Sequence, residues 1–268
     1  MISFESYFKD FCSPSDYGLS CTIKDKPLYI IGSGGSIRDV NVKLIVKNND
    51  TMTINRCWYY LQHLKGIEPT YNVTLDPTEF WGIFTETDII SSGIKKTPRD
   101  TIFCMHQTVY DVTAGKYNGK LKERAKQLKP MLRNFEKNGA KIIKVPNDIN
   151  FDSRFLLGKG DPGFINGVEN KLSMLALPLA YKLGYKNIFL LGTDYNHKTG
   201  HWYRKPDVES EIKYSKGGPY SQQGAADGER AIMNYTILKK WNELFKKRGG
   251  SITSLVPTNL TKIHNYLK

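Results

Sequence analysis

The sequence predicts an α/β fold: a doubly wound, mostly parallel, Rossmann-like sheet with a lid segment. Three observations support this fold class. Short runs of β-prone residues alternate with helix-like segments along most of the chain. The run Ile188–Leu191 is apolar without polar alternation, as expected of a parallel strand covered on both faces. The 268 residues, 40% hydrophobic and 24% charged, suffice for one large domain.

Elements in the amino-terminal half follow from β-branched and aromatic runs for strands, and from turn residues between them. Residues 1–26 are expected to form an N-terminal extension, and the regular alternation begins at Pro27. The expected elements are, in order, a strand at Leu28–Ile31, a helix at Val40–Val46, strands at Thr51–Cys57 and Tyr71–Leu75, a helix at Thr78–Ile90 and a strand at Thr101–Met105. Cys57 and Cys104 therefore fall in predicted strands, where a buried free thiol is the expected state.

Elements in the carboxyl-terminal half depend more on helical periodicity. Asn118–Asn138 predicts a basic amphipathic helix with a kink or break at Pro130 and an end at Gly139. At Leu172–Leu183, apolar residues recur at spacings of three and four, which predicts a core-facing helix. The other expected elements are a strand at Lys141–Val145, a loop at Gly158–Gly167, the strand Ile188–Leu191, a helix at Ala231–Lys247, a strand at Ser251–Val256 and a helix at Asn259–Leu267.

The segment 196–228 predicts a lid. It has more than 30 residues without a strong apolar period, which is unusual inside a compact domain unless the segment is functional or disordered. Its content of His197, His201, Trp202 and Tyr203 is atypical of a disordered segment. We therefore expect a lid over about 196–228 within a nucleotide-binding domain that spans 27–268.

The first candidate site is the glycine loop Gly32, Ser33, Gly34, Gly35 and Ser36, which directly follows the first predicted strand. Glycines there let backbone N–H groups approach a phosphate, with the next helix N-terminus aimed at it. The pattern is neither the dinucleotide fingerprint nor a P-loop, so neither dinucleotide nor ATP binding follows from it. A tight strand-to-helix turn is the alternative explanation.

Polar residues also follow the other predicted strands. Asn55 and Arg56 close the second strand, and Asp76 closes the third. The strand at Ile188–Leu191 ends in Gly192, Thr193, Asp194 and Tyr195. Open α/β sheets bind ligands at the carboxyl ends of their strands, so these residues are expected to share one rim. An Asn amide can bind a base or a sugar, and an Arg can neutralise a phosphate.

Histidines in the lid are the candidates for a general base. Imidazole titrates near neutrality, so His201 or His197 could accept a proton from a hydroxyl. His106 ends another predicted strand and is a rival. No cluster of His, Cys or Asp has a metal-binding spacing, and the lack of a Gly-X-Ser-X-Gly sequence argues against a serine hydrolase.

The formal net charge of +13 predicts attraction to polyanions: nucleic acid, an anionic membrane surface or phosphate-bearing small substrates. A solvated lysine-rich surface with no such partner is the alternative. We find no cleavable signal and no apolar run of membrane-spanning length, and the four cysteines show no close-spaced metal pattern. A cytoplasmic, reduced location is therefore expected.

Together these residues resemble a known family. The Gly-X-Gly-X-Ser loop, the strand-end Asn-Arg and the sequence LGYKNIFLLGTD are similar to those of the bacterial sialyltransferases. They resemble equally a related group of domains that includes the archaeal 6-hydroxymethylpterin diphosphokinases. The strongest match is Ala176–Tyr195. Weaker matches lie at Leu28–Ser36, Ile54–Tyr60 and Ile252–Asn259.

The resemblance implies a nucleotide-sugar site. In the sialyltransferases, CMP-sialic acid lies over the glycine loop, the strand-end Asn and the Gly-X-Asp strand, which correspond to Gly32, Ser33, Gly34, Ser36, Asn55 and Asp194. Tyr203 would bind the phosphate. The family's lid His lies close to where this chain has Glu229, so His201 and Glu229 are both candidate bases. The transfer needs no metal or cofactor.

The resulting prediction is a nucleotide-sugar-dependent glycosyltransferase that transfers a sugar to an acceptor hydroxyl. One alternative is a pterin-type diphosphokinase that uses ATP and Mg²⁺, with Asp76 and Asp194 as metal ligands. A second alternative, suggested by the charge, is a nucleic-acid-associated or nucleic-acid-modifying protein.

Overall fold

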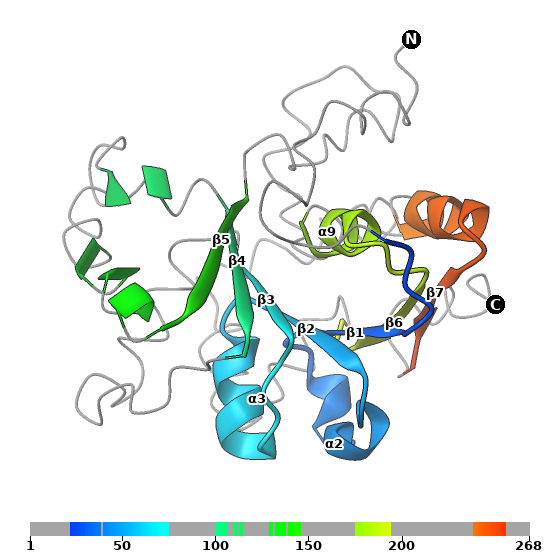
Figure 1. Ribbon diagram of the computed structural model, residues 1–268. Helices are drawn as coiled ribbons and strands as arrows, with labels where there is room; N and C mark the ends of the chain where they lie inside the picture. The colour runs from blue at the N-terminus through cyan, green and yellow to red at the C-terminus, as the bar shows by residue number, and fades with distance from the viewer. Residues whose placement is uncertain are drawn as a thin grey trace, which may run out of the picture.

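A computed structural model describes residues 22–38, 40–74, 100–106, 110–111, 113–114, 129–130, 132–133, 135–137, 139–145, 175–193 and 238–255. These residues contain one seven-stranded sheet of order β5-β4-β3-β2-β1-β6-β7 (Figure 1). Its strands are β1 (Leu28–Ile31), β2 (Asp50–Ile54), β3 (Tyr71–Thr74), β4 (Ile102–His106), β5 (Lys141–Val145), β6 (Asn187–Leu191) and β7 (Ser251–Ser254). Every neighbouring pair is parallel, which confirms the predicted α/β class.

Helices cover both faces of the sheet. Helices α2 (Val42–Ile45) and α3 (Cys57–Lys65) lie on one face, and α9 (Leu177–Lys182) lies on the other together with the helical residues 238–247 (Figure 1). A short 3₁₀ turn, η2 (Gly35–Ile37), follows β1. This arrangement is the predicted doubly wound architecture.

Two hydrophobic cores result from the alternation of side chains along the central strands. Leu28 and Ile30 of β1 pack with α9 and the 238–247 helix, in the core that also contains Trp241. Ile31 of the same strand packs in the other core, which contains residues of α2 and α3. Both faces of β1 are therefore buried, and this explains why its sequence, Leu28–Ile31, lacks polar alternation.

The structure corrects the predicted end of the second strand. The strand expected at Thr51–Cys57 ends at Ile54, and Cys57 is the first residue of α3, a helix that the sequence pattern did not predict. The physical reason is Asn55, which has a left-handed backbone with φ of 52° and turns the chain out of the sheet. Cys57 and Cys104 are both buried free thiols, as expected.

One helix end and two strands have the boundaries that the sequence predicts. Gly139 has φ of 89° and ends a helical stretch, and the Ala140 N–H donates to the Phe135 carbonyl at 3.2 Å, as in a Schellman cap. Strands β1 and β5 match their predicted ranges. Several predicted segments lie outside the described residues: the helices expected at Thr78–Ile90 and Asn259–Leu267, residues 1–21 of the extension and the lid at 196–228.

Candidate functional site

The strand order places a topological switch point between β1 and β6. From β1 the chain builds β2, β3, β4 and β5 outward in one direction, and then returns to place β6 on the other side of β1. Connections on the two sides of such a point diverge, which leaves a crevice at the carboxyl ends of the two strands. Gly32 follows β1 there, and Gly192 follows β6.

Two glycines hold these strand ends together. The Gly32 N–H donates to the Leu191 carbonyl at 2.8 Å, and the Gly34 N–H donates to the Gly192 carbonyl at 2.7 Å. A Cβ at position 32 would lie 2.4 Å from the Gly192 oxygen, so only glycine fits. Part of the glycine loop therefore serves close packing, which was the alternative explanation of its sequence. Because the N–H groups of Gly32 and Gly34 are engaged, any phosphate contact must come from other amides of the loop.

Thr193 lies beside this glycine contact. A Cβ at Gly32 would be 3.1 Å from the Thr193 Cγ2 atom, so Thr193 borders the start of the glycine loop. The loop runs into η2, a single 3₁₀ turn that Gly34 precedes without a side-chain cap, whereas α2, the helix expected at Val40–Val46, begins only at Val42. A three-residue turn has a much smaller dipole than a full helix, so the loop amides matter more than the dipole here.

Asn55 forms a left-handed corner at the end of β2, next to β1 in the sheet. Its side chain is only 8% exposed, and its Oδ1 atom has no hydrogen-bond partner among the described residues. A buried polar atom without a partner costs free energy, and native structures retain few of them. An acceptor at this rim is therefore free to receive a donor, such as a ligand hydroxyl or amino group.

Helix α3 starts directly after this corner. Arg56 is its N-cap residue and makes no side-chain cap, and the first turn contains no acidic residue. The N-terminal amides of a helix favour negative charge, and the absence of a competing Asp or Glu leaves that preference intact. The predicted pair Asn55–Arg56 is thus at the rim, as expected.

Asn72 of the neighbouring strand β3 holds the Asn55 corner through a hydrogen bond. The sequence pattern did not identify this residue. It is fully buried in the middle of β3, and its Nδ2 atom donates to the Asn55 carbonyl at 2.8 Å. An asparagine inside an otherwise buried strand was the available signal, since such a polar group needs specific partners.

The structure thus brings together Gly32, Ser33, Gly34, Gly35, Ser36, Asn55, Arg56 and Thr193, at the carboxyl ends of the three neighbouring strands β2, β1 and β6. The other predicted site residues lie outside the described residues: Asp76, Asp194, Tyr195, His197, His201, Tyr203 and Glu229. His106 is the last residue of β4, which is two strands away from β2. Within the described ranges, no group of three or more His, Cys, Asp or Glu side chains could hold a metal ion.

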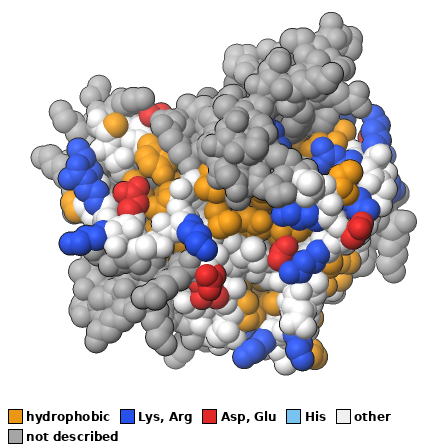
Figure 2. All heavy atoms as spheres, viewed as in Figure 1, with side chains coloured by type: hydrophobic (Ala, Val, Ile, Leu, Met, Phe, Trp, Pro, Cys, Tyr) orange, Lys and Arg blue, Asp and Glu red, His pale blue; other side chains and the backbone are white. Residues whose placement is uncertain are grey.

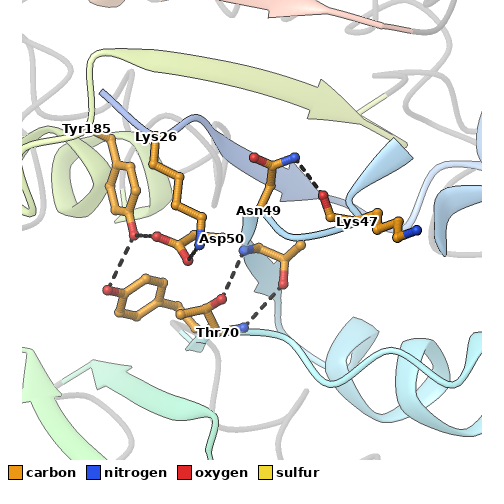
Figure 3. A network of polar contacts seen from close by, with 8 residues as sticks. Lys26, Lys47, Asn49, Asp50, Thr70 and Tyr185 are labelled. Carbon is orange, nitrogen blue, oxygen red and sulfur yellow. Dashed lines mark hydrogen bonds and ion pairs between the residues drawn. The ribbon is translucent and has the colours of Figure 1, made fainter. Parts of the chain in front are cut away.

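A polar network occupies the opposite edge of the sheet, where the strands begin (Figure 3). The Tyr185 hydroxyl donates to Asp50 Oδ2 at 2.6 Å, and Lys26 forms an ion pair with Asp50 Oδ1 at 2.8 Å. The Tyr185 hydroxyl is also 3.4 Å from that of Tyr71, and Lys24 lies over the Tyr185 ring at 4.4 Å. Burial, followed by the hydrogen bond to Asp50, raises the pKa of Tyr185 above its ordinary value. This polar cluster therefore lies at the opposite ends of the strands from the candidate rim.

Buried groups elsewhere also have shifted pKa values. Burial raises the pKa of the Cys104 thiol to about 12. Burial, with the nearby Glu136 carboxylate, raises the pKa of Tyr110 to about 12. Both shifts favour the neutral form, so neither residue is prepared to act as a nucleophile or base near neutral pH.

The positive charge is spread out on the face of the molecule that Figure 2 shows. Lys and Arg side chains there lie among hydrophobic and uncharged atoms, with Asp and Glu between some of them. Some basic residues of the described part are in ion pairs, such as Lys186 with Asp25 at 2.5 Å. None of the helices that the structure describes has the length and apolar content that a bilayer-spanning helix needs.

No protein-family model and no curated protein sequence matches this chain. Solved structures that are similar include the sialyltransferase CstII from Campylobacter jejuni in complex with cytidine-5'-monophosphate, at 14% identity over 89% of this chain and 83% of that chain, with a TM-score of 0.42. The same enzyme with CMP-3FNeuAc gives 15% identity, coverage of 91% and 85%, and a TM-score of 0.43. An alpha-2,3-sialyltransferase from Campylobacter jejuni in apo form is 13% identical over 88% of this chain and 78% of that chain, with a TM-score of 0.37. Similarities at this level do not identify an activity.

Proposed function

We propose that this chain is a glycosyltransferase that uses a nucleotide-sugar and transfers the sugar to an acceptor hydroxyl. The observation that carries the proposal is the buried, unpartnered Oδ1 atom of Asn55 at the end of β2, the strand next to β1 and its glycine loop. A ligand bound in that crevice would satisfy this oxygen with a hydroxyl or amino hydrogen of its nucleoside. The sequence resemblance around Ala176–Tyr195 extends the proposal from a nucleotide to a nucleotide-sugar.

In the proposed reaction, the acceptor oxygen attacks the anomeric carbon of the sugar as the bond to the nucleotide phosphate breaks. Amides of the glycine loop other than those of Gly32 and Gly34, together with Arg56, would stabilise the charge on the departing phosphate. Tyr203 would add a hydroxyl contact to it. His201 or Glu229 would accept the acceptor proton, and Asp194, which follows β6 in the sequence, would be part of the donor site. No metal is required.

A nucleotide panel tests the proposal. CMP, UMP, UDP, AMP and ATP, and the CMP- and UDP-sugars, would be compared by thermal shift with and without Mg²⁺, because a ligand that binds the folded state raises the melting temperature. We expect a pyrimidine nucleotide or its sugar to stabilise the chain without metal. A response only to ATP with Mg²⁺ would instead support the pterin-type diphosphokinase, and no response to any nucleotide would remove both.

The variant Asn55→Gly tests the residue that carries the proposal. Glycine accepts the left-handed backbone, so the fold should be retained while the amide is lost. We expect the affinity for the best nucleotide to fall by about tenfold or more, which equals about 1.4 kcal/mol. The matched control is Asn48→Gly, because Asn48 is also left-handed, with φ of 62°, but is exposed before the start of β2. Equal affinities of the two variants would contradict the assignment of Asn55.

A further inference from the structure

The Asn55 corner receives a hydrogen bond from a side chain of the neighbouring strand β3. Its N–H still donates to the Val73 carbonyl of β3 at 2.8 Å, as in regular strand pairing. Its left-handed φ of 52° departs from strand geometry at this point. The Asn72 Nδ2 atom donates to the Asn55 carbonyl at 2.8 Å, so a side chain of β3 holds the corner.

The Asn72 amide is held in one orientation by its other contacts. Its Nδ2 atom also donates to Thr53 Oγ1 at 3.0 Å, and lies 3.4 Å from the Thr53 carbonyl. Its Oδ1 atom accepts from the Thr74 hydroxyl at 2.9 Å. Three acceptors lie at the nitrogen and one donor at the oxygen, so a flipped amide would place its oxygen against carbonyl groups. The orientation is therefore determined by the network.

This network joins β3 to the neighbouring strand β2. The Thr53 hydroxyl, which accepts from Asn72, donates to the Tyr71 carbonyl at 3.3 Å. Thr53, Asn72 and Thr74 are buried, at 0%, 0% and 1% exposure. Polar groups buried this deeply are stabilising only when every donor and acceptor is satisfied, and here the network satisfies them. The corner is consequently fixed to the rigid interior of the sheet.

We propose that Asn72 is a positioning residue of the candidate nucleotide site: its buried amide holds the Asn55 carbonyl and so fixes the corner from which the Asn55 side chain and α3 emerge. The inference that this matters for a ligand depends on the proposed function. Asn72 does not contact the ligand in this proposal, and it acts only through Asn55 and the first turn of α3.

A matched pair of substitutions tests the proposal. Asn72→Leu removes the amide at similar size. Asn242→Leu is its control, since Asn242 is also buried, at 3% exposure, and accepts from the Ile252 N–H at 2.8 Å on the other core of the sheet. Both variants should lose stability, because each leaves a buried backbone group unsatisfied. Only Asn72→Leu should disturb the corner.

Two readouts separate positioning from general destabilisation. The first is hydrogen exchange at the Asn55 and Tyr59 amides without ligand, which should become faster in Asn72→Leu than in Asn242→Leu. The second is the affinity for CMP, or for whichever nucleotide stabilises the wild-type chain most. We expect Asn72→Leu to bind it at least about tenfold more weakly, and Asn242→Leu to stay within about twofold of wild type.

A milder pair covers the case in which Asn72→Leu does not fold. Thr53→Val removes the hydroxyl that receives the Asn72 amide, and Thr101→Val removes an equally buried hydroxyl that donates to the Pro69 carbonyl at 2.6 Å. Both substitutions keep the shape of the side chain. We expect about threefold weaker nucleotide binding for Thr53→Val and no change for Thr101→Val.

The outcomes separate this inference from the proposed function. Unchanged exchange at Asn55 and Tyr59 relative to the control would overturn the positioning role. Faster exchange with unchanged nucleotide affinity would overturn its importance for the ligand. If the wild-type chain bound no nucleotide, the proposed function would fail, and the exchange measurement would still decide whether Asn72 fixes the corner.

Discussion

Gly192 sets how closely the two strand ends of the switch point approach each other. Its φ of 62° is left-handed, and a Cβ there would lie 2.9 Å from the Gly32 oxygen and 3.1 Å from the Ile37 Cδ1 atom. Gly66, at the end of α3, has φ of 64° but no heavy atom within 4 Å of such a Cβ. The two glycines therefore share a backbone conformation and differ in what surrounds them.

This comparison yields a stability prediction. Gly66→Ala should cost only the strain of the left-handed backbone, about 1–2 kcal/mol. Gly192→Ala should cost about 1–3 kcal/mol more, because the added methyl group also overpacks the contact with Gly32. Urea unfolding of the two variants measures the difference. Equal losses would mean that the strand ends can separate without cost.

At the level of single residues, the sequence predicted which residues lie at the rim, but not that Asn72 holds one of them in place. Glycine and polar residues after strands are visible locally, and Gly32, Asn55, Arg56 and Thr193 lie at the rim as expected. The role of Asn72 depends on a bond to Asn55 in the neighbouring strand, 17 residues away in the chain. Pairing register determines that contact, and a single sequence does not reveal register.

Helix α3 shows why an element can be missed. Thr51, Thr53 and Ile54 are β-branched and favour a strand by propensity, and the pattern predicts that this strand continues to Cys57. The structure ends β2 three residues earlier, because Asn55 adopts a left-handed conformation and α3 then packs Trp58 against Phe103 at 5.1 Å between ring centroids. Tertiary packing of an aromatic residue decided the outcome against its local preference.

The network at the starting edge of the sheet links several elements, and Tyr185 is its centre. Tyr185→Phe would remove the donor to Asp50 Oδ2 and the contact with the Tyr71 hydroxyl. We expect the free energy of unfolding to fall by about 1–3 kcal/mol at neutral pH, since a hydrogen bond to a charged group is lost. Asp50 would keep its ion pair with Lys26, so the variant should still fold.

The same substitution has a pH signature. Burial and the bond to Asp50 raise the folded-state pKa of Tyr185 above 10, the ordinary value. Its contribution to stability is therefore complete below pH 10 and is lost as the pH rises above 10 towards the folded-state pKa. Urea unfolding at pH 8, 9.5 and 10.5 should show a smaller loss of stability in Tyr185→Phe than in wild type. Identical losses in both chains would contradict this account.

For the molecule as a whole, the net charge of +13 raises the question of a polyanionic partner. On the face in Figure 2, basic side chains are interspersed with other types rather than gathered in one patch. We expect only weak, sequence-independent binding to random duplex DNA, with a Kd of about 10⁻⁴–10⁻⁶ M at physiological salt. Fluorescence anisotropy at several salt concentrations measures it, and the affinity should fall steeply as salt rises.

A control separates this charge effect from function. Duplex at saturating concentration should not displace a nucleotide bound at the rim. Binding tighter than about 10⁻⁸ M at physiological salt, with a preference for one sequence, would favour the nucleic-acid alternative instead.

The fold class could be predicted from the alternation of strands and helices, but the strand order could not. Alternation and the apolar run at Ile188–Leu191 both indicate a parallel sheet with two covered faces. Neither indicates that β6 pairs with β1, because that contact joins distant parts of the chain. The position of the switch point, and hence of the candidate site, needed the structure.

The pairing of β1 with β6 has a consequence for synthesis on the ribosome. Leu28 pairs with Ile188, 160 residues later in the chain, whereas it pairs with Asp50 after only 22 residues. At about 5–20 residues per second, β1 has β2 available roughly 7 to 27 seconds before β6 is made. The crevice between Gly32 and Gly192 can therefore be completed only after residue 192 has been translated, and a nascent chain can hold a ligand there only from that moment.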